Sequence, residues 1–234
     1  MKHLHFLDLG SIPIFEQLQI EEALLRASDL NVCLISRGSP RAIVMGISGQ
    51  PHTHLDVAKV KRDKIPVIKR FSGGGTVIVD ENTLFITFVC GKDFLDIHPF
   101  PEPILRWGQT LFAQSWKIPD FRLTENDYTI GKLKCGGNAQ YITKDRWLHH
   151  TSFLWDYRDE NMEYLLLPDK RPHYRESRSH RDFLCRLKDF APSKEELLLR
   201  LRQELQKQFK LQELSAKEIK TGPHRKAAQW IELA

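Results

Sequence analysis

A run of three glycines beside two basic residues is the segment of this chain best suited to bind an anion. Residues 69–76 read KRFSGGGT, and Arg70 offers a planar guanidinium that matches a phosphate or a carboxylate. Glycines let the backbone approach a ligand closely and turn its N–H groups towards it. The motif is neither a P-loop nor a G-x-G-x-x-G dinucleotide motif. It indicates either another kind of nucleotide site or a structural turn.

A second glycine-containing segment carries lysines. Residues 131–140 read GKLKCGGNAQ, which predicts a flexible turn. Lys134 within it could neutralise a carboxylate substrate and a phosphate together while an acyl phosphate forms. The alternative is a surface hairpin with solvated lysines. Asn126 and Asp127, just upstream, could face the same pocket or could be turn residues.

A cysteine and two histidines are the remaining candidates for reactive groups. Cys135 could be a nucleophile if a neighbouring base lowered its pKa, and a buried inert thiol is the alternative. His149 and His150 are adjacent, so on a strand they point to opposite faces and cannot share one metal ion. At most one of them lines a pocket. No other His or Cys spacing resembles a zinc site, so we expect no metal site built from protein side chains alone.

The charge of the chain is concentrated in two segments. Its formal net charge is +5, while residues 59–70 and residues 170–188 each carry a net +5 of their own. Such clusters suit an acidic protein, a nucleic acid or a phosphorylated small molecule. Nucleic acid is disfavoured because few aromatic residues lie among the basic ones and no nucleic-acid-binding module is present.

Composition points to a globular protein in a reducing compartment. Of the 234 residues, 41% are hydrophobic and 28% are charged, and the four cysteines are too sparse and too far apart for a disulfide framework. The N-terminus lacks a signal or transit pattern, and no apolar run approaches the roughly 18 residues that a membrane span needs. We therefore expect a cytoplasmic protein with no membrane segment.

The elements that must position these residues mix helices and strands without a regular βαβ rhythm. Apolar periodicity predicts a helix over Ile14–Ala27, a second from about Pro103, a short one over Asn161–Leu167 that Pro168 ends, and a last one that the capping box at Ser193 opens. Short apolar stretches bounded by Gly, Pro, Asn or Asp predict strands over Val32–Ile35, Ile43–Ile47, Thr76–Val79, Leu84–Val89, Tyr128–Ile130 and Trp147–Trp155. Residues 80–82 predict a hairpin turn. The expected class is mixed α/β (α+β), with helices flanking a mixed β-sheet.

Several of these segments, in order and at matching spacing, resemble lipoate–protein ligases. Residues 70–80 (RFSGGGTVIVD) are similar to that family's R-R-x-S-G-G-G-x-V-x-H-D segment, and residues 134–140 (KCGGNAQ) are similar to its K-x-x-G-[NS]-A segment. Residues 143–150 (TKDRWLHH) are similar to its T-K-D-R-x-x-H-H stretch, and 168–170 to a P-D-K further on. Phe15–Arg26 is similar to the family's first helix.

The resemblance implies a fold and a domain organisation. The fold is the catalytic-domain fold shared with biotin–protein ligases. Residues 1–190 would form the catalytic domain, and residues 191–234 a C-terminal helix and tail packed on it. Many of these ligases carry a further C-terminal domain that assists adenylation, and we expect this chain to lack it. The resemblance therefore leaves open whether adenylation by this chain needs a separate accessory polypeptide.

The activity that the resemblance implies is two-step lipoylation. Lipoate and ATP would give lipoyl-AMP and pyrophosphate, with Mg²⁺ carried on the phosphates, and a carrier lysine would then take the lipoyl group. The implied carriers are the acidic lipoyl domains of 2-oxoacid dehydrogenase complexes and the glycine-cleavage carrier protein. The residues that the resemblance assigns are Arg70, Gly75, Thr76, Val77 and Ile78 for ATP, Lys134 for the α-phosphate and the lipoate carboxyl, and Gly73, Gly74 and His149 for lipoate. The basic segment 170–188, with Arg175, Arg178 and Arg181, is expected to face the carrier.

The chain departs from the family pattern at several positions. Val79 stands where the family has His, and Thr151 and Ser152 follow the two histidines in place of Gly-Thr. Lys69 replaces an Arg, and Cys135 replaces an aliphatic residue. Two alternatives therefore stay open: an ATP-independent octanoyl- or lipoyl-transferase that uses a cysteine thioester, with Cys135 the nearest candidate, and a non-catalytic protein that binds lipoyl domains.

Overall fold

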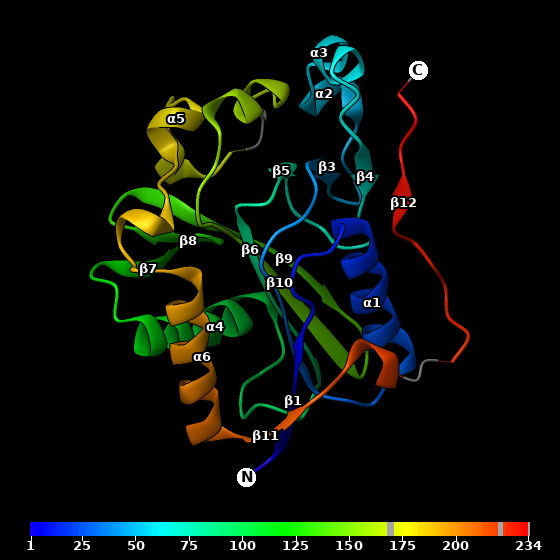
Figure 1. The fold of residues 1–234 in the computed structure, drawn as a ribbon, viewed down its shortest axis with the longest axis vertical. Helices are drawn as coiled ribbons and strands as arrows, with labels where there is room; N and C mark the ends of the chain where they lie inside the picture. The colour runs from blue at the N-terminus through cyan, green and yellow to red at the C-terminus, as the bar shows by residue number, and fades with distance from the viewer. Residues whose placement is uncertain (168–170, 220–221, 234) are drawn as a thin grey trace.

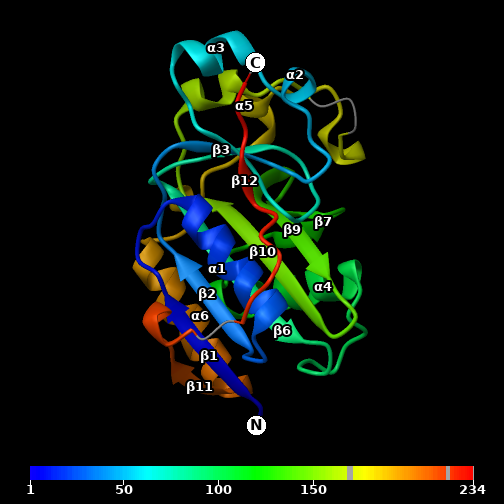
Figure 2. The ribbon, with the colours of Figure 1, turned by 90° about the vertical axis from the view of Figure 1, so that its right-hand side faces the viewer.

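A large mixed sheet forms the centre of the molecule, and helices cover both of its faces (Figures 1 and 2). The computed structural model describes residues 1–167, 171–219 and 222–233. The strand order is β11-β1-β2-β6-β10-β9-β8-β7, parallel where β1 meets β11 and β2 and antiparallel elsewhere. These strands are β1 His3–Asp8, β2 Val32–Ser36, β6 Thr83–Gly91, β7 Phe121–Thr124, β8 Asp127–Ile130, β9 Leu133–Ile142, β10 Arg146–Leu154 and β11 Lys210–Glu213. The expected mixed α+β fold is confirmed.

The long α-helices divide between the two faces of this sheet. Helix α1 (Ile14–Ala27) packs on β6 and β10, while α4 (Pro101–Trp116) and α6 (Lys194–Gln208) pack together on the opposite face (Figure 2). Helix α6 begins as expected: the Ser193 hydroxyl accepts the Glu196 N–H, and Leu198, Leu201 and Leu205 are buried. The C-terminal residues therefore contribute both to the large sheet and to its helical cover. In the part of the chain that the structure describes, no helix is long and apolar enough to cross a membrane.

A smaller sheet lies beyond one end of the large one, in the order β12-β4-β3-β5 (Figure 1). Its strands are β3 Ala42–Met45, β4 Val67–Lys69, β5 Val77–Val79 and β12 Gln229–Trp230. Short helices border it: α2 Pro51–His54, α3 Val57–Arg62, α5 His180–Phe183 and the 3₁₀ turns η1 Asp159–Tyr164 and η2 His173–Arg175. Two further 3₁₀ turns, η3 Leu187–Asp189 and η4 Ala216–Glu218, flank α6 and β11.

Three local predictions are wrong. The strands on either side of residues 80–82 do not pair, because β5 joins the small sheet while β6 is central to the large one. The segment predicted as a short helix over Asn161–Leu167 is the 3₁₀ turn η1, which ends at Tyr164. The lysine- and glycine-containing segment is strand β9 and not a flexible turn, hydrogen-bonded to β8 and β10.

Packing explains why glycines lie in a strand. Gly136 stands opposite Phe153 of β10, and a Cβ on Gly136 would lie 2.8 Å from the buried Phe153 ring. Glycine at this position makes room for the aromatic core and does not provide flexibility. The P-D-K segment, Pro168-Asp169-Lys170, lies outside the described residues.

Candidate active site

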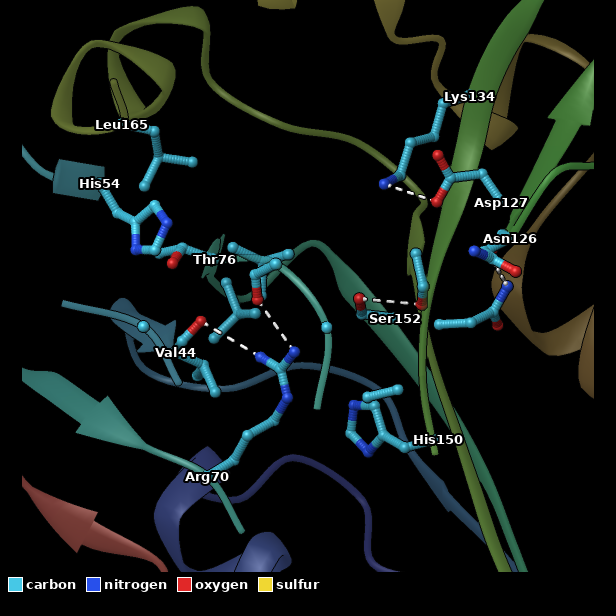
Figure 3. A pocket seen from close by; sticks show the side chains of 18 of the residues that line it. Val44, His54, Arg70, Thr76, Asn126, Asp127, Lys134, His150, Ser152 and Leu165 are labelled. Carbon is cyan, nitrogen blue, oxygen red and sulfur yellow. Dashed lines mark hydrogen bonds and ion pairs between the residues drawn. The ribbon is translucent and has the colours of Figure 1, made fainter. Parts of the chain in front are cut away.

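A cavity of about 580 Å³ opens between the two sheets, and both glycine-containing segments line it (Figure 3). Its wall includes Gly74–Val77 from the first segment and Lys134, Gly137, Asn138 and Ala139 from β9. Residues of the segment after 170 line another side. A smaller recess of about 100 Å³ shares several of these residues and adds Ile78. The two predicted glycine segments, 60 residues apart in the sequence, therefore meet at one site.

Arg70 organises the glycine segment from inside. Its side chain is buried, and Nη2 donates to the carbonyl oxygens of Gly73 and Gly75 at 2.8 and 2.9 Å. Nε donates again to Gly73, and Nη1 donates to the Val44 carbonyl at 3.4 Å (Figure 3). Burial lowers the pKa of Arg70 to about 10, which leaves it charged at neutral pH. The guanidinium thus holds the turn by several donors at once.

Glycine is required at the centre of this turn. Gly74 has φ +100°, a conformation that side chains disfavour, and a Cβ there would lie 2.8 Å from Arg70 Nη2. Gly46 faces it, because a Cβ on Gly46 would lie 2.1 Å from the Gly74 carbonyl oxygen. The three-glycine run is therefore packed tightly around the arginine on one side while its exposed side lines the cavity.

Lys134 lies on the opposite wall from Arg70 (Figure 3). Its Nζ is 2.8 Å from Asp127 Oδ1, and Asp127 Oδ2 accepts a hydrogen bond from the Tyr174 hydroxyl at 2.9 Å. Burial and the charge of Asp127 raise the pKa of Tyr174 above its usual value, so this hydroxyl stays protonated and donates. Strand β8 supplies Asp127 beside a register shift in its pairing with β9. A cation with one carboxylate partner is thereby held at the cavity surface.

The two histidines lie on opposite faces of β10, as expected. His150 lines the cavity, and its Nδ1 lies 2.9 Å from Glu21 Oε1, which also accepts from the Thr87 hydroxyl. His149 is fully buried on the other face, with Nε2 3.0 Å from the Tyr128 hydroxyl. Burial and the neighbouring His150 lower the pKa of His149 to about 3, so it is neutral. His149 is not among the residues that line the described cavity, and its predicted contact with lipoate stays a prediction.

Glu21 was not anticipated from the sequence. It is fully buried on α1, one turn after Leu18, on the helix face that packs against the sheet. A carboxylate within an apolar helix stripe is the sequence signal that could have identified it, because such a group needs a partner when buried. His150 and Thr87 are those partners.

Cys135 and Asn126 differ in their access to the cavity. The Cys135 side chain is buried, its Sγ donates to the Tyr128 carbonyl at 3.3 Å, and burial raises the pKa of this thiol. Cys135 does not line the described cavity. Asn126 does line it, and its carbonyl accepts from the Asn138 side chain. The geometry favours the inert-thiol interpretation of Cys135.

The arginines of the second basic segment do not share one face. Arg175 is only 5% exposed and lines the cavity, so the prediction that it faces a protein partner is wrong. Arg178 donates to the Lys132 and Tyr174 carbonyls. Arg181 is 79% exposed at its side chain and pairs with Asp159. The segment therefore turns one cation inward and leaves another on the surface.

Apolar and charged side chains both line the cavity. The apolar lining comprises Ile14, Leu18, Val44, Val77, Val79, Phe85, Ala139, Leu165, Leu166, Pro172 and Phe183. Charged residues in the lining are Arg70, Glu125, Asp127, Lys134, Arg171 and Arg175. Among the described residues, no group of three or more His, Cys, Asp or Glu side chains is placed to hold a metal ion. The arrangement suits a molecule with an apolar chain and an anionic head.

The sequence matches the model of the lipoyl protein ligase A/B catalytic domain over residues 13–210. One relative is the inactive lipoate–protein ligase 2 of Plasmodium falciparum, 29% identical over 79% of this chain. This chain covers 63% of the length of that relative and 33% of the length of another, the probable lipoate-protein ligase A of Mycoplasma pneumoniae, which is 30% identical over 49% of this chain.

Solved structures show the same fold. A bipartite lipoate protein ligase of Thermoplasma acidophilum, studied with its E2 lipoyl domain, superposes with a TM-score of 0.77 at 22% identity, over 93% of this chain and 89% of that one. A lipoate-protein ligase A bound with ATP superposes with a TM-score of 0.74 at 20% identity, over 93% and 91%. The family match over residues 13–210 shows that this chain belongs to the lipoyl protein ligase A/B catalytic-domain family.

Proposed function

We propose that this chain is an ATP-dependent lipoate–protein ligase, which activates lipoate as lipoyl-AMP and transfers the lipoyl group to a lysine of a carrier domain. The observation that carries the proposal is the position of Lys134. Its ammonium lies on the wall of a cavity that apolar side chains also line, opposite a glycine turn held by Arg70 (Figure 3). Lipoate, with a hydrocarbon chain and one carboxylate, has matching chemistry.

In this mechanism the apolar residues of the cavity hold the acyl chain, and Lys134 binds the carboxylate. The same ammonium would offset the negative charge that develops as the carboxylate oxygen attacks the α-phosphorus of ATP and pyrophosphate departs. Gly75, Thr76, Val77 and Ile78 would line the nucleotide. The predicted contact of Arg70 with ATP phosphates stays a prediction, and in the structure its donors hold backbone carbonyls.

Mg²⁺ is the implied cofactor of the adenylation step. Glu125, Asn126 and Asp127 line the cavity and offer oxygen donors, which suit a hard cation bound together with phosphates. When bound, the ion would neutralise phosphate charge. The protein side chains would keep the substrate carboxylate and the nucleotide together, which lowers the entropic part of the barrier.

The partner in the second step is proposed to be an acidic lipoyl domain. The neighbouring Thermoplasma protein was studied with an E2 lipoyl domain and is described as bipartite. We accordingly propose that a lipoyl carrier is the acceptor. We also propose that a separate accessory protein takes part, and it should be included in the assays. The cysteine-transferase alternative has less support, because Cys135 is buried away from the described cavity.

The test is a modification assay on an apo lipoyl domain, read by mass spectrometry, with lipoate and with or without ATP and Mg²⁺. We expect the acceptor to gain one lipoyl group only when ATP is present. Lys134→Ala should abolish the gain, whereas Lys132→Ala, which alters an exposed lysine two residues away, should keep it. Retained activity in Lys134→Ala would overturn the role of Lys134. Modification only from an octanoyl thioester donor would instead favour the transferase.

A further inference from the structure

We infer that the recess beside Lys134 binds a phosphate group and that Arg175 is the residue of the second basic segment that holds it. This inference rests on the proposed function, because it names the residue that would hold the anionic part of the nucleotide. It differs from the expected carrier contact, since Arg175 points inward. It also goes beyond the residues assigned by family resemblance.

Arg175 is a buried cation with incomplete hydrogen bonding. Its Nε donates to the Arg178 carbonyl at 3.2 Å, and its guanidinium carbon lies 4.7 Å from the centre of the Phe183 ring. Nη2 is buried and has no acceptor among the described residues. A buried charged donor without an acceptor is costly, so a site of this kind is stabilised by an anion that supplies one.

A second unpartnered polar group lines the same recess. The Thr76 hydroxyl oxygen is buried and has no hydrogen-bond partner in the described part of the chain. Thr76 and Arg175 both line the recess of about 100 Å³, together with Lys134 and His180. A hydroxyl, a guanidinium and an ammonium are three donors that can bind the oxygens of one phosphate group.

The surrounding charge also favours an anion. Arg171 lines the main cavity as Arg175 does, and burial, followed by the charge of Arg171, lowers the pKa of Arg175. The charges of Arg175 and Lys134, after burial, lower the pKa of His180 to about 4. Glu125 and Asp127 are the carboxylates that line the cavity there, and Asp127 already pairs with Lys134. The cations exceed the carboxylates in the cavity lining.

The two buried arginines of the cavity therefore differ in what their donors do. Arg70 uses all three of its nitrogen atoms on the carbonyls of Val44, Gly73 and Gly75. Arg175 uses Nε on its own segment and keeps Nη2 unpartnered among the described residues. Arg70 acts as a positioning residue for the glycine turn, and Arg175 has a donor for a phosphate oxygen.

The experiment measures the affinities of the full chain for ATP, for inorganic pyrophosphate and for lipoate by calorimetry. In Arg175→Met we expect ATP and pyrophosphate to bind about tenfold or more weakly, as the loss of a charge-assisted hydrogen bond requires. Lipoate should bind within about twofold of wild type, which also reports an intact cavity. Arg181→Gln, which alters the exposed arginine six residues away, should leave all three affinities unchanged within about the same twofold margin. Arg175→Lys keeps the positive charge but loses the planar guanidinium, so its affinities for ATP and pyrophosphate should lie between those of wild type and Arg175→Met.

The outcomes separate this inference from the proposed function. Equal ATP and pyrophosphate affinity in wild type and Arg175→Met would overturn the phosphate site and leave the ligase proposal standing. Pyrophosphate binding that depends on Arg175, together with no lipoyl-AMP in a parallel assay that contains an accessory protein, would support the site and overturn the ligase proposal. Wild type that binds neither ATP nor pyrophosphate would overturn both. If Arg175→Met fails to fold, Arg175→Lys and Arg175→Gln take its place in the same comparison.

Discussion

Lys134 Nζ lies 2.8 Å from Asp127 Oδ1, and the other oxygen of that carboxylate accepts the Tyr174 hydroxyl. Two neighbouring strands and one distant turn therefore fix the position of one ammonium: β9 carries the lysine, β8 the carboxylate and η2, about 40 residues further on, the tyrosine.

Asp127→Asn should slow lipoyl-AMP formation about tenfold to a hundredfold, because the neutral amide holds Lys134 less firmly and misplacement by about 1 Å can cost a hundredfold. Pyrophosphate release in the first turnover measures this step. Tyr174→Phe removes only the hydrogen bond behind the carboxylate and should cost less. An Asp127→Asn protein with the wild-type rate would show that the ion pair does not position Lys134.

Glu21→Ala should destabilise the fold by about 2–4 kcal/mol, because it leaves His150, Thr87 and Gln17 without their buried acceptor. Urea denaturation of the variant and of Glu16→Ala, an exposed glutamate on the same helix, measures the difference. The control should lie within about 0.5 kcal/mol of wild type. Similar midpoints for the two variants would mean that Glu21 contributes nothing through these contacts.

The pKa of His149, lowered to about 3 from 6.5, predicts that stability falls in acid. Between these two values the unfolded chain binds a proton that folded His149 does not, so the contribution is complete above about pH 6.5 and decreases as the pH falls. Its size is up to about 1.4 kcal/mol per pH unit below that point.

Denaturation of wild type and His149→Gln at pH 7.5 and 5.5 tests this. The difference between the two pH values should be about 1 kcal/mol smaller in the variant, whatever its absolute stability. If the stability difference between the two pH values is the same in wild type and His149→Gln, then groups other than His149 cause the loss of stability in acid.

Gly136→Ala should destabilise the protein by about 1–3 kcal/mol, because the new methyl group would lie 2.8 Å from the Phe153 ring in the core. Gly91→Ala is the matched control, since the nearest atom to its Cβ would be the Asn31 side-chain oxygen at 3.6 Å. Thermal unfolding of both variants checks this. If Gly136→Ala is as stable as wild type, steric packing against Phe153 is not the reason for a glycine at this position.

Local pattern was sufficient for the elements with a strong apolar period. Helix α1 has the bounds that its periodicity predicts, Ile14–Ala27, and α6 begins at the predicted Ser193 cap. The predicted hairpin between Val79 and Leu84 is wrong, because a short apolar run indicates a buried strand but not the sheet that the strand joins. The glycines of β9 were misassigned for a related reason: the Phe153 ring that requires Gly136 lies on another strand.

Residue chemistry by itself singled out an arginine–glycine turn and a lysine suited to acyl phosphate formation. Only the tertiary structure decided which groups share the cavity, because partners such as Glu21 for His150 and Tyr174 for Asp127 come from separate elements. It likewise turned Arg175 inward and Arg181 outward, six residues apart on one basic segment. Charge is a property of the sequence, but burial and hydrogen-bond partners depend on what the rest of the chain packs beside each residue.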